Sequence, residues 1–321
     1  MRVPSGAVLL GCLFVSGSAP AKGLENDEKG RILGELLSGT RRVVDRDIER
    51  IRFGGVPRDL MGRIAQLAVD GPLTGRQNAV YVLTILADKP SGPALVRALG
   101  DEDVVVRQTA AQGVGKLKLR EGVPQLEKLS RDGSPVVRRE ALKALGLIGD
   151  RGASPAVLTA LEDTESEPRL AAILALGEMH ETKAIPKLTP LLGYPSESVR
   201  LAAVKSLCML GNADGRKYVE KLLAGAEINE RRDGVNLVAD VKDRWVQEAF
   251  IRLLEDKDAG VRISAAKALS RQGDGRGVQW LVLTAPKVEP EERLRIESAI
   301  EEVGVTPQDR KRILAAAKAK R

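Results

Sequence analysis

The chain has 321 residues, of which 43% are hydrophobic, 30% are charged and only 2% are aromatic, with a net charge of +7. This composition indicates a soluble, ordered, helical protein and gives no sign of the large globular core of a typical enzyme. The single histidine, His180, has no second histidine with which to form a metal site or to activate a nucleophile. We therefore expect no catalytic residues, no metal site and no cofactor.

Residues 1–21 resemble a secretory signal peptide. Arg2 gives a positive start, an apolar run follows from Ala7 to Val15, and Ala19-Pro20-Ala21 offers a cleavage site of small residues. The apolar run is too short to span a bilayer. We expect cleavage after Ala21 and an exported protein, periplasmic or secreted.

The two cysteines bear on the same question. Leu9-Leu10-Gly11-Cys12 resembles a lipobox, so the alternative is a lipoprotein that is attached to the membrane through Cys12. Removal of the leader leaves only Cys208 and therefore no intramolecular disulfide. We expect Cys208 to be buried, because the equivalent positions of the 31-residue repeats described below hold mostly small residues.

Residues 22–60 do not follow the repeat that dominates the rest of the chain, although residues 32–51 have helical periodicity. We interpret them as an N-terminal helical cap that covers the exposed face of the first repeat.

From residue 61 to 307 the chain repeats every 31 residues. Aliphatic residues lie seven positions after a recurring arginine, apolar residues lie 12 positions before it, and the spacing is typical of one buried face of a helix. Prolines upstream fit the first turn of a preceding helix. The pattern predicts an all-α fold, an α-solenoid of about eight two-helix repeats that are stable only when stacked. The recurring arginines are Arg76, Arg107, Arg138, Arg169, Arg200, Arg231, Arg262 and Arg293.

The unit VPQLEKLSRDGSPVVRREALKALGLIGD, residues 123–150, resembles the short HEAT-like repeat named after phycobilisome lyases. The resemblance extends over about residues 61–305 and is specific for the fold. It is much less specific for function, because such repeats serve scaffolds, lyase subunits and regulators alike.

The resemblance implies a role for the recurring arginines. HEAT-like repeats often stack arginine and aspartate side chains in a ladder along an interior seam, which would set the register between repeats. An open track of arginines for an anionic ligand is the alternative. The ladder predicted for this chain comprises Arg76, Arg107, Arg138, Arg169, Arg200 and Arg262 with Asp70, Asp101, Asp132, Asp163 and Asp256.

The resemblance also implies that the second helix of each repeat lines a concave surface that binds a partner. Lysines interleaved with Leu and Met on that surface would suit a partly acidic protein or peptide. The residues that we expect there are Lys116, Lys143, Leu147, Leu174, Lys205, Met209, Lys267 and Arg271.

Two segments depart from the pattern. In residues 216–244 glycines replace the aspartate and alanine of the repeat, and Asp233, Asn236 and Asp240 put acid on the presented face. Neutral drift and a specific contact site for a basic group both explain this divergent repeat. Residues 308–321 are basic and rich in alanine, typical of a final helix or a frayed tail.

Taken together, the sequence predicts a non-enzymatic scaffold of the bacterial cell envelope that binds a protein or peptide. The alternatives are a nucleic-acid-binding HEAT-like protein, favoured by the pI of 9.4, and a subunit similar to bilin lyases. We do not expect nucleic acid as the partner, because the excess charge is small for so long an array and few aromatic residues are available for base stacking. Membrane contact is expected only if Cys12 is lipidated.

Overall fold

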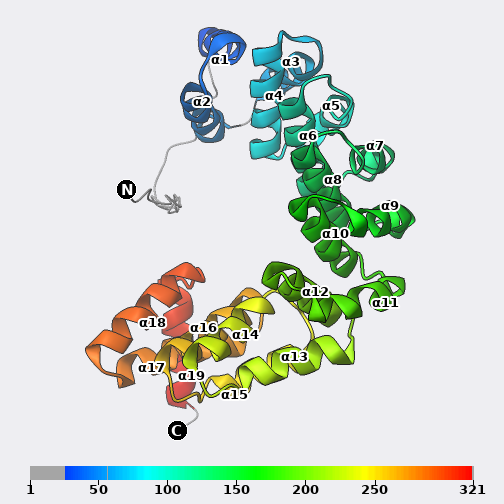
Figure 1. Ribbon diagram of the computed structural model, residues 1–321. Coiled ribbons are helices and arrows are strands. Elements are labelled where there is room, and N and C mark those ends of the chain that lie inside the picture. The colour runs from blue at the N-terminus through cyan, green and yellow to red at the C-terminus, as the bar shows by residue number, and fades with distance from the viewer. Residues whose placement is uncertain (1–25, 56, 320–321) are drawn as a thin grey trace, which may run out of the picture. The chain divides into compact units, whose positions relative to one another are not determined.

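A computed structural model describes residues 26–55 and 57–319. All regular secondary structure in these residues is helical (Figure 1). Their contacts divide the chain into two compact units, residues 1–113 and 114–321, which we describe separately. The predicted signal peptide and Cys12 lie outside the described residues.

The first unit begins with two helices from the segment expected to form a cap. Both pack against α4 through buried residues that include Ile32, Leu36 and Ile48. Asn78 of α4 donates to the carbonyl oxygen of Leu36 at 3.0 Å, which joins the cap to the first repeat. The helices are α1 (Asn26–Ser38), α2 (Arg41–Phe53), α3 (Arg58–Asp70), α4 (Leu73–Leu86), α5 (Gly92–Ala98) and α6 (Val104–Leu117), which continues into the second unit.

The second unit continues the alternation of first and second helices. Its helices are α7 (Val123–Leu129), α8 (Pro135–Ile148), α9 (Ser154–Thr159), α10 (Ser166–Glu178), α11 (Ile185–Leu188), α12 (Glu197–Met209), α13 (Ala213–Leu223), α14 (Ile228–Leu237), α15 (Arg244–Leu253), α16 (Ala259–Arg271), α17 (Gly275–Thr284), α18 (Pro290–Glu302) and α19 (Pro307–Ala319). Within this unit α7, α9 and α11 lie in one row and α8, α10 and α12 in another (Figure 1). Second helices pack directly on one another, as α8 does on α10 and α10 on α12.

The two apolar columns of the repeat form the interior. Leu145, Leu176 and Leu207 of the second helices are at most 1% exposed, and Leu126 and Val157 of the first helices are fully buried. Each such side chain contributes about 1.5–3 kcal/mol by leaving water. The α-solenoid fold predicted from the 31-residue period is confirmed.

Glycine brings successive second helices into backbone contact. A Cβ atom on Gly146 of α8 would lie 2.9 Å from Cα of Ala175, and one on Gly177 of α10 would lie 2.9 Å from Cα of Ser206. These distances are too short for a side chain, so glycine sets the spacing between α8, α10 and α12.

A residue with positive φ ends most second helices at the same place in the repeat. Gly149, Gly211 and Gly273 adopt φ of 71°, 69° and 85°. Ala87 and His180 take the same role with φ of 53° and 51°, although a Cβ atom makes this conformation unfavourable.

Candidate partner-binding surface

The structure distributes the predicted surface residues over five second helices. Among them, Lys116, Lys143, Leu147 and Arg271 are exposed, whereas Leu174, Lys205, Met209 and Lys267 are partly buried. Lys116 lies on α6, Lys143 and Leu147 on α8, Leu174 on α10, Lys205 and Met209 on α12, and Lys267 and Arg271 on α16.

Two of the predicted lysines are paired with acids of the following repeat. Lys205 Nζ lies 2.7 Å from Asp240 Oδ2, and Lys267 Nζ lies 2.5 Å from Glu302 Oε2. Both pairs join residues that are 35 positions apart. We did not predict these acids from the sequence, although the common spacing of 35 residues between lysine and acid was a signal that could have found them.

The remaining cations are more open to a partner. Lys143 is 52% exposed and its nearest acid, Glu140 on the same helix, is 3.4 Å away. Arg271 is 58% exposed and lies 3.6 Å from Glu302. The pair of Arg271 with Glu302 is exposed and contributes little, so the charge of Arg271 can turn to a partner at small cost. Glu140 is buried and is also paired with Arg139 at 2.7 Å, so it keeps a cation when Lys143 turns to a partner.

A pocket of about 320 Å³ opens at the carboxyl ends of α10 and α12. Met209 and Cys208 line it from α12, Glu178 and His180 line it from the end of α10, and residues 240–243 close it. Of the predicted surface residues, Met209 therefore lines the pocket, and Lys205 is held at its edge by Asp240.

The divergent repeat creates this pocket. Helix α14 has 10 residues, whereas α12 has 13, and the chain from Val238 to Asp243 leaves the helical path and lies along the pocket. Gly234 and the β-branched Val235 are poor helix formers, which accounts for the early end. Gln272 of the next repeat donates to the carbonyl oxygens of Ala239 at 2.9 Å and Val241 at 3.2 Å, which holds the segment in place.

The surroundings of the pocket raise the pKa values of two of its side chains. Partial removal from water, opposed by Lys205 and reinforced by Asp240, raises the pKa of Glu178. Burial, with a contribution from Asp243, raises the pKa of the Cys208 thiol to about 12. The thiol is 1% exposed and therefore stays protonated and unreactive near neutral pH, as expected for a buried cysteine.

His180 contributes to helix ending. It is exposed, its Nδ1 atom lies 3.3 Å from the carbonyl oxygen of Met209, and it adopts positive φ.

Within residues 26–55 and 57–319, no three His, Cys, Asp or Glu side chains come together in a way that could hold a metal ion. The same residues contain no helix that is long and apolar enough to span a membrane.

The recurring arginines from Arg76 to Arg262 are partly or fully buried in the seam between repeats and make hydrogen bonds within the protein, whereas Arg293 is exposed. Arg138 donates to both carboxylate oxygens of Asp163, at 2.7 and 2.9 Å, and to the carbonyl oxygen of Asp132 at 2.9 Å. Arg76 makes the same bidentate contact with Asp101 in the first unit, at 2.8 and 3.1 Å. The arginine of one repeat thus holds the aspartate of the next and the loop of its own.

Three of the remaining arginines of the predicted ladder complete only part of this contact. Arg169, Arg200 and Arg262 each donate to a carbonyl oxygen of the loop six residues before them, as Arg107 also does. Of these four, Arg169, Arg200 and Arg262 have no aspartate 25 positions later in the sequence. Arg262 also contacts Glu292 instead of an aspartate. Asp70 at the end of α3 has no ion pair within the described residues.

Arg231 is the most buried of the recurring arginines, although we did not include it in the predicted ladder. It donates to both carboxylate oxygens of Asp256, at 2.8 and 3.0 Å, and is 5% exposed. The divergent repeat therefore keeps its arginine contact although it has lost its aspartate and alanine.

The ladder is interrupted next to the pocket. The aspartate that Arg169 would contact is replaced by Tyr194, whose ring centroid lies 5.7 Å from the guanidinium carbon, and Nε of Arg169 is buried without an acceptor in the described part of the chain. The aspartate that Arg200 would contact is replaced by Gly225.

Three overlapping segments, residues 92–168, 123–208 and 154–236, match the family model of HEAT repeats. The sequence matches no curated protein. Among solved structures, the complex of CpcE and CpcF of phycocyanin lyase from Nostoc sp. PCC7120 is similar, with 22% identity and a TM-score of 0.54 over 78% of this chain and 96% of that chain.

Two further structures are more distant in geometry. Human deoxyhypusine hydroxylase in complex with glycerol has 19% identity and a TM-score of 0.35 over 76% of this chain and 95% of that chain. An engineered protein has 20% identity and a TM-score of 0.44 over 90% of this chain and 88% of that chain. The matched repeats and the stacked pairs of helices show that this chain is a HEAT-repeat protein, a scaffold of a kind that generally binds other proteins.

Proposed function

We propose that the chain is a non-enzymatic scaffold that binds a protein or peptide on the second helices of residues 114–321. The observation that supports this best is the pocket at the ends of α10 and α12, which lies on the row of helices that HEAT arrays present to partners. Met209 lines it, and Leu174 and Leu147 lie on the two preceding second helices. Apolar side chains beside a pocket of this kind are typical of the centre of a protein interface.

The charges favour a partner that carries both an apolar anchor and acidic groups. Lys143 and the exposed Lys242 flank the apolar residues on either side, whereas Lys205 is already paired with Asp240. An apolar side chain of the partner would enter the pocket, and carboxylates beside it would meet Lys143 and Lys242. The carboxylates of Glu178 and Asp240 would in turn reject a partner that is acidic at the anchor itself.

We infer further that this scaffold works outside the cytoplasm, in the bacterial cell envelope. The support is the pattern of charge, apolar run and small residues in the first 21 positions. A lipoprotein attached through Cys12 is the alternative form, and the two differ in the mass of the mature N-terminus.

The similarity to the phycocyanin lyase complex supports one rival function, attachment of a bilin to an acceptor protein. At 22% identity this likeness concerns the fold. Coexpression with a bilin source and an apo-biliprotein would reveal lyase activity as covalent pigment on the acceptor, an outcome that would contradict the scaffold function.

The scaffold function is tested by comparing partners of three tagged chains after crosslinking in cells. The chains are the wild type, a Leu147→Asp/Met209→Asp double variant, and a Leu294→Asp control. Leu294 is 72% exposed on α18 and does not line the pocket at Met209, so this control tests binding at the pocket rather than on every second helix. We expect one dominant envelope protein with the wild type and the control, and its loss with the double variant. Mass spectrometry of the same samples gives the mature N-terminus, expected after Ala21.

The opposite results are equally clear. Partners that remain unchanged in the double variant would show that the second-helix surface does not bind them. An intact Met1 with cytoplasmic partners would contradict export.

A further inference from the structure

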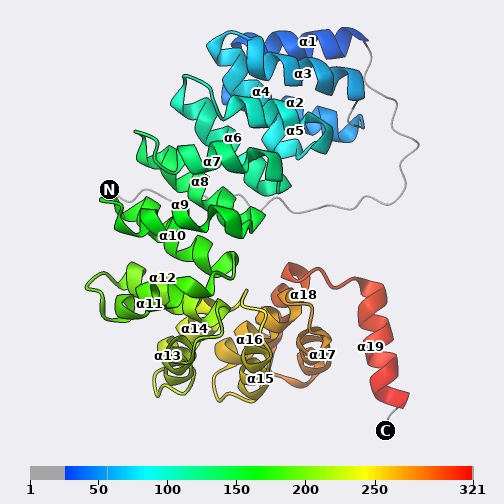
Figure 2. The same ribbon diagram turned by 90° about the vertical axis from the view of Figure 1, so that its right-hand side faces the viewer.

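Helix α19 is packed more loosely than the other helices of the second unit. None of its residues from Pro307 to Ala319 is buried, and only Ile313 and Leu314 place part of an apolar side chain against the unit. Its firmest attachment is polar, because Arg310 donates to both carboxylate oxygens of Glu297 at 2.6 and 2.5 Å. Figure 2 shows α19 at the C-terminal end, beside α17.

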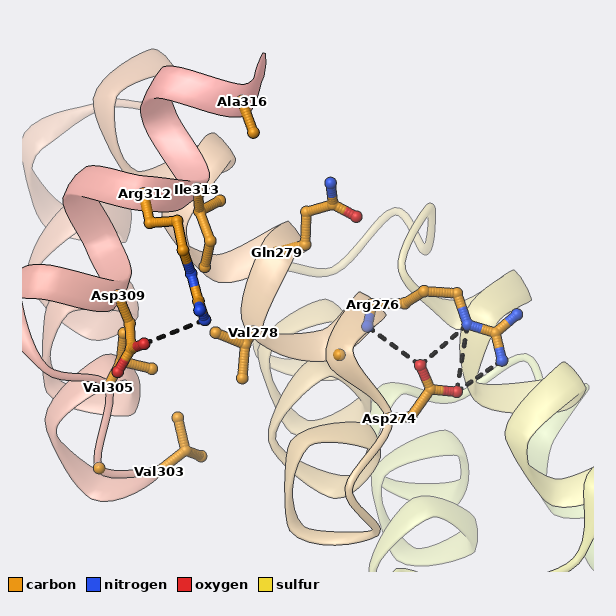
Figure 3. A pocket seen from close by; sticks show the side chains of 12 residues that line it. Asp274, Arg276, Val278, Gln279, Val303, Val305, Asp309, Arg312, Ile313 and Ala316 are labelled. Atoms are coloured by element: carbon orange, nitrogen blue, oxygen red, sulfur yellow. Dashed lines mark hydrogen bonds and ion pairs between the residues drawn. The ribbon is translucent and has the colours of Figure 1, made fainter.

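This loose packing leaves an apolar groove between α17 and α19. The larger part has a volume of about 790 Å³ and is lined by Val278, Val305 and Ile313 (Figure 3). A second part of about 380 Å³ is lined by Leu283 and Leu314. Gln279 lines both parts, so the two adjoin at this residue. We call the two parts together the α17–α19 groove; each has a volume typical of ligand-binding sites.

Basic side chains stand at both ends of the groove. At the larger part Arg312 reaches from α19 toward Val278 and is 80% exposed (Figure 3). At the smaller part Lys287 and Lys318 line the groove, and neither makes an ion pair within the described residues. Arg312 is paired with Asp309 at 3.2 Å, and its side chain remains largely exposed (Figure 3). The groove therefore combines an apolar floor with one exposed, paired arginine and two lysines without an ion pair among the described residues.

The acids near the groove are already used by the helix ends. Asp274 accepts from the backbone N–H of Arg276 at 3.0 Å and holds the Arg276 guanidinium, which keeps the pKa of Asp274 below its usual value. Asp309 accepts from Thr306 Oγ at 2.6 Å, and this hydrogen bond lowers the pKa of Asp309. The carboxylate of Asp274 caps α17, and that of Asp309, in the first turn of α19, also pairs with Arg312 at 3.2 Å. Both acids line the larger part of the groove, and neither pairs with Lys287 or Lys318.

We propose that the α17–α19 groove binds an acidic amphipathic peptide segment of a partner protein. Its apolar side chains enter the two parts of the groove on either side of Gln279, and its carboxylates meet Arg312 at one end and Lys287 and Lys318 at the other. The site is separate from the surface around Met209, and the proposal stands whether or not that surface binds a partner.

The test uses the full chain and a fluorescein-labelled peptide of about 16 residues, in which leucines recur at intervals of three and four and glutamates fill the other positions. A second peptide keeps the leucines and replaces the glutamates with lysines. Fluorescence anisotropy should show binding of the acidic peptide alone. We expect a Lys287→Glu/Lys318→Glu variant to bind it at least about tenfold more weakly, because attraction at one end of the groove becomes repulsion.

Two further variants separate this site from the one under Proposed function. Ile313→Asp puts a charge in the floor from a helix without buried residues, so the fold should persist by circular dichroism while peptide binding falls. Lys143→Glu/Lys242→Glu makes the same charge change on the second-helix surface and should leave peptide binding unchanged.

Several results would overturn the inference. They are equal binding of the lysine peptide, binding that is insensitive to the groove variants, or binding that is lost only in Lys143→Glu/Lys242→Glu, which would leave the proposed function standing and remove the groove. Failure of the peptide to bind, with vesicles of phosphatidylglycerol binding through Lys287 and Lys318 instead, would assign the groove to a membrane surface.

Discussion

The pairing of one arginine with one aspartate is repeated along the seam, and its burial decides its energetic weight. Arg138 is 15% exposed and Asp163 is 9% exposed, so their contact is neither open to solvent nor strongly screened by salt. The guanidinium of Arg138 holds the pKa of Asp163 below its usual value. The family resemblance predicted arginines and aspartates along an interior seam, but which aspartate each arginine contacts, and how far the pair is buried, depend on how the repeats stagger.

Loss of Arg138 should be costly. Arg138→Ala leaves the carboxylate of Asp163 largely buried without its bidentate partner and the carbonyl of Asp132 without a donor. We expect the free energy of unfolding to fall by about 3 kcal/mol, measured by thermal or urea denaturation. Arg244→Ala is the control, since Arg244 is 91% exposed; equal melting temperatures of the two variants would contradict a structural ladder.

A buried acid in the first unit predicts a pH dependence. Asp47 on α2 is fully buried, and burial together with Glu35 raises its pKa from 3.8 to about 6 despite the contact with Arg50 at 2.9 Å. A raised carboxyl pKa favours folding below the unfolded value, and this contribution is lost as the pH rises from about 4 through 6.

Asp47→Asn removes the charge that causes this loss. We expect the melting temperature of the variant, relative to that of the wild type, to rise between pH 5 and pH 7.5 by a few degrees. Differential scanning fluorimetry at a series of pH values measures this difference. A constant difference across the series would show that Asp47 does not titrate in this range.

At the scale of an element, the ends of the second helices follow one rule with a few exceptions. Gly149, Gly211 and Gly273 adopt the left-handed conformation that ends their helices, but Ala87 adopts φ of 53° at the end of α4. Glycine has no Cβ atom to oppose this conformation.

Ala87→Gly should therefore stabilise the protein. The expected gain is about 1 kcal/mol, reduced by the greater freedom of glycine in the unfolded chain, and urea denaturation measures it. Ala315→Gly, in the exposed interior of α19, serves as the opposite case and should lower stability by about 1 kcal/mol. A loss of stability in Ala87→Gly as well would refute the argument from φ.

Elements also show where prediction from the sequence stopped. Glycines at 225 and 234 marked the divergent repeat, but the path of the chain after α14 also depends on Gln272 of the next repeat, which donates to the carbonyl oxygens of Ala239 and Val241. The pairs of Lys205 with Asp240 and of Lys267 with Glu302 were missed for a related reason. These pairs join neighbouring repeats. The sequence gives the length of a repeat, but it does not show how far one repeat is shifted along the next, and this shift decides which side chains meet.

At the scale of the whole molecule, the fold could be predicted because a solenoid is built from contacts between neighbours alone. In one repeat after another, the residues at the positions of Leu145 and Leu126 are buried. The two binding sites that we propose depend on residues that differ from repeat to repeat. The 31-residue pattern describes only the residues that the repeats have in common, so it does not predict these sites. The pocket at Met209 and the α17–α19 groove both lie where the structure departs from the regular repeat, at the divergent repeat and at the last helix.

The early end of α14 has a consequence for how such proteins change. The repeat keeps its 31-residue length, but its second helix is three residues shorter than α12 and the residues after it line a cavity. The arginine of the same repeat stays bound to Asp256. Because the alteration is confined to one repeat, the segment from Ile228 to Asp243 could be transplanted into another repeat. Grafted into another position of the array, together with a glutamine in the following module, it would move the cavity along the scaffold without redesign of the rest.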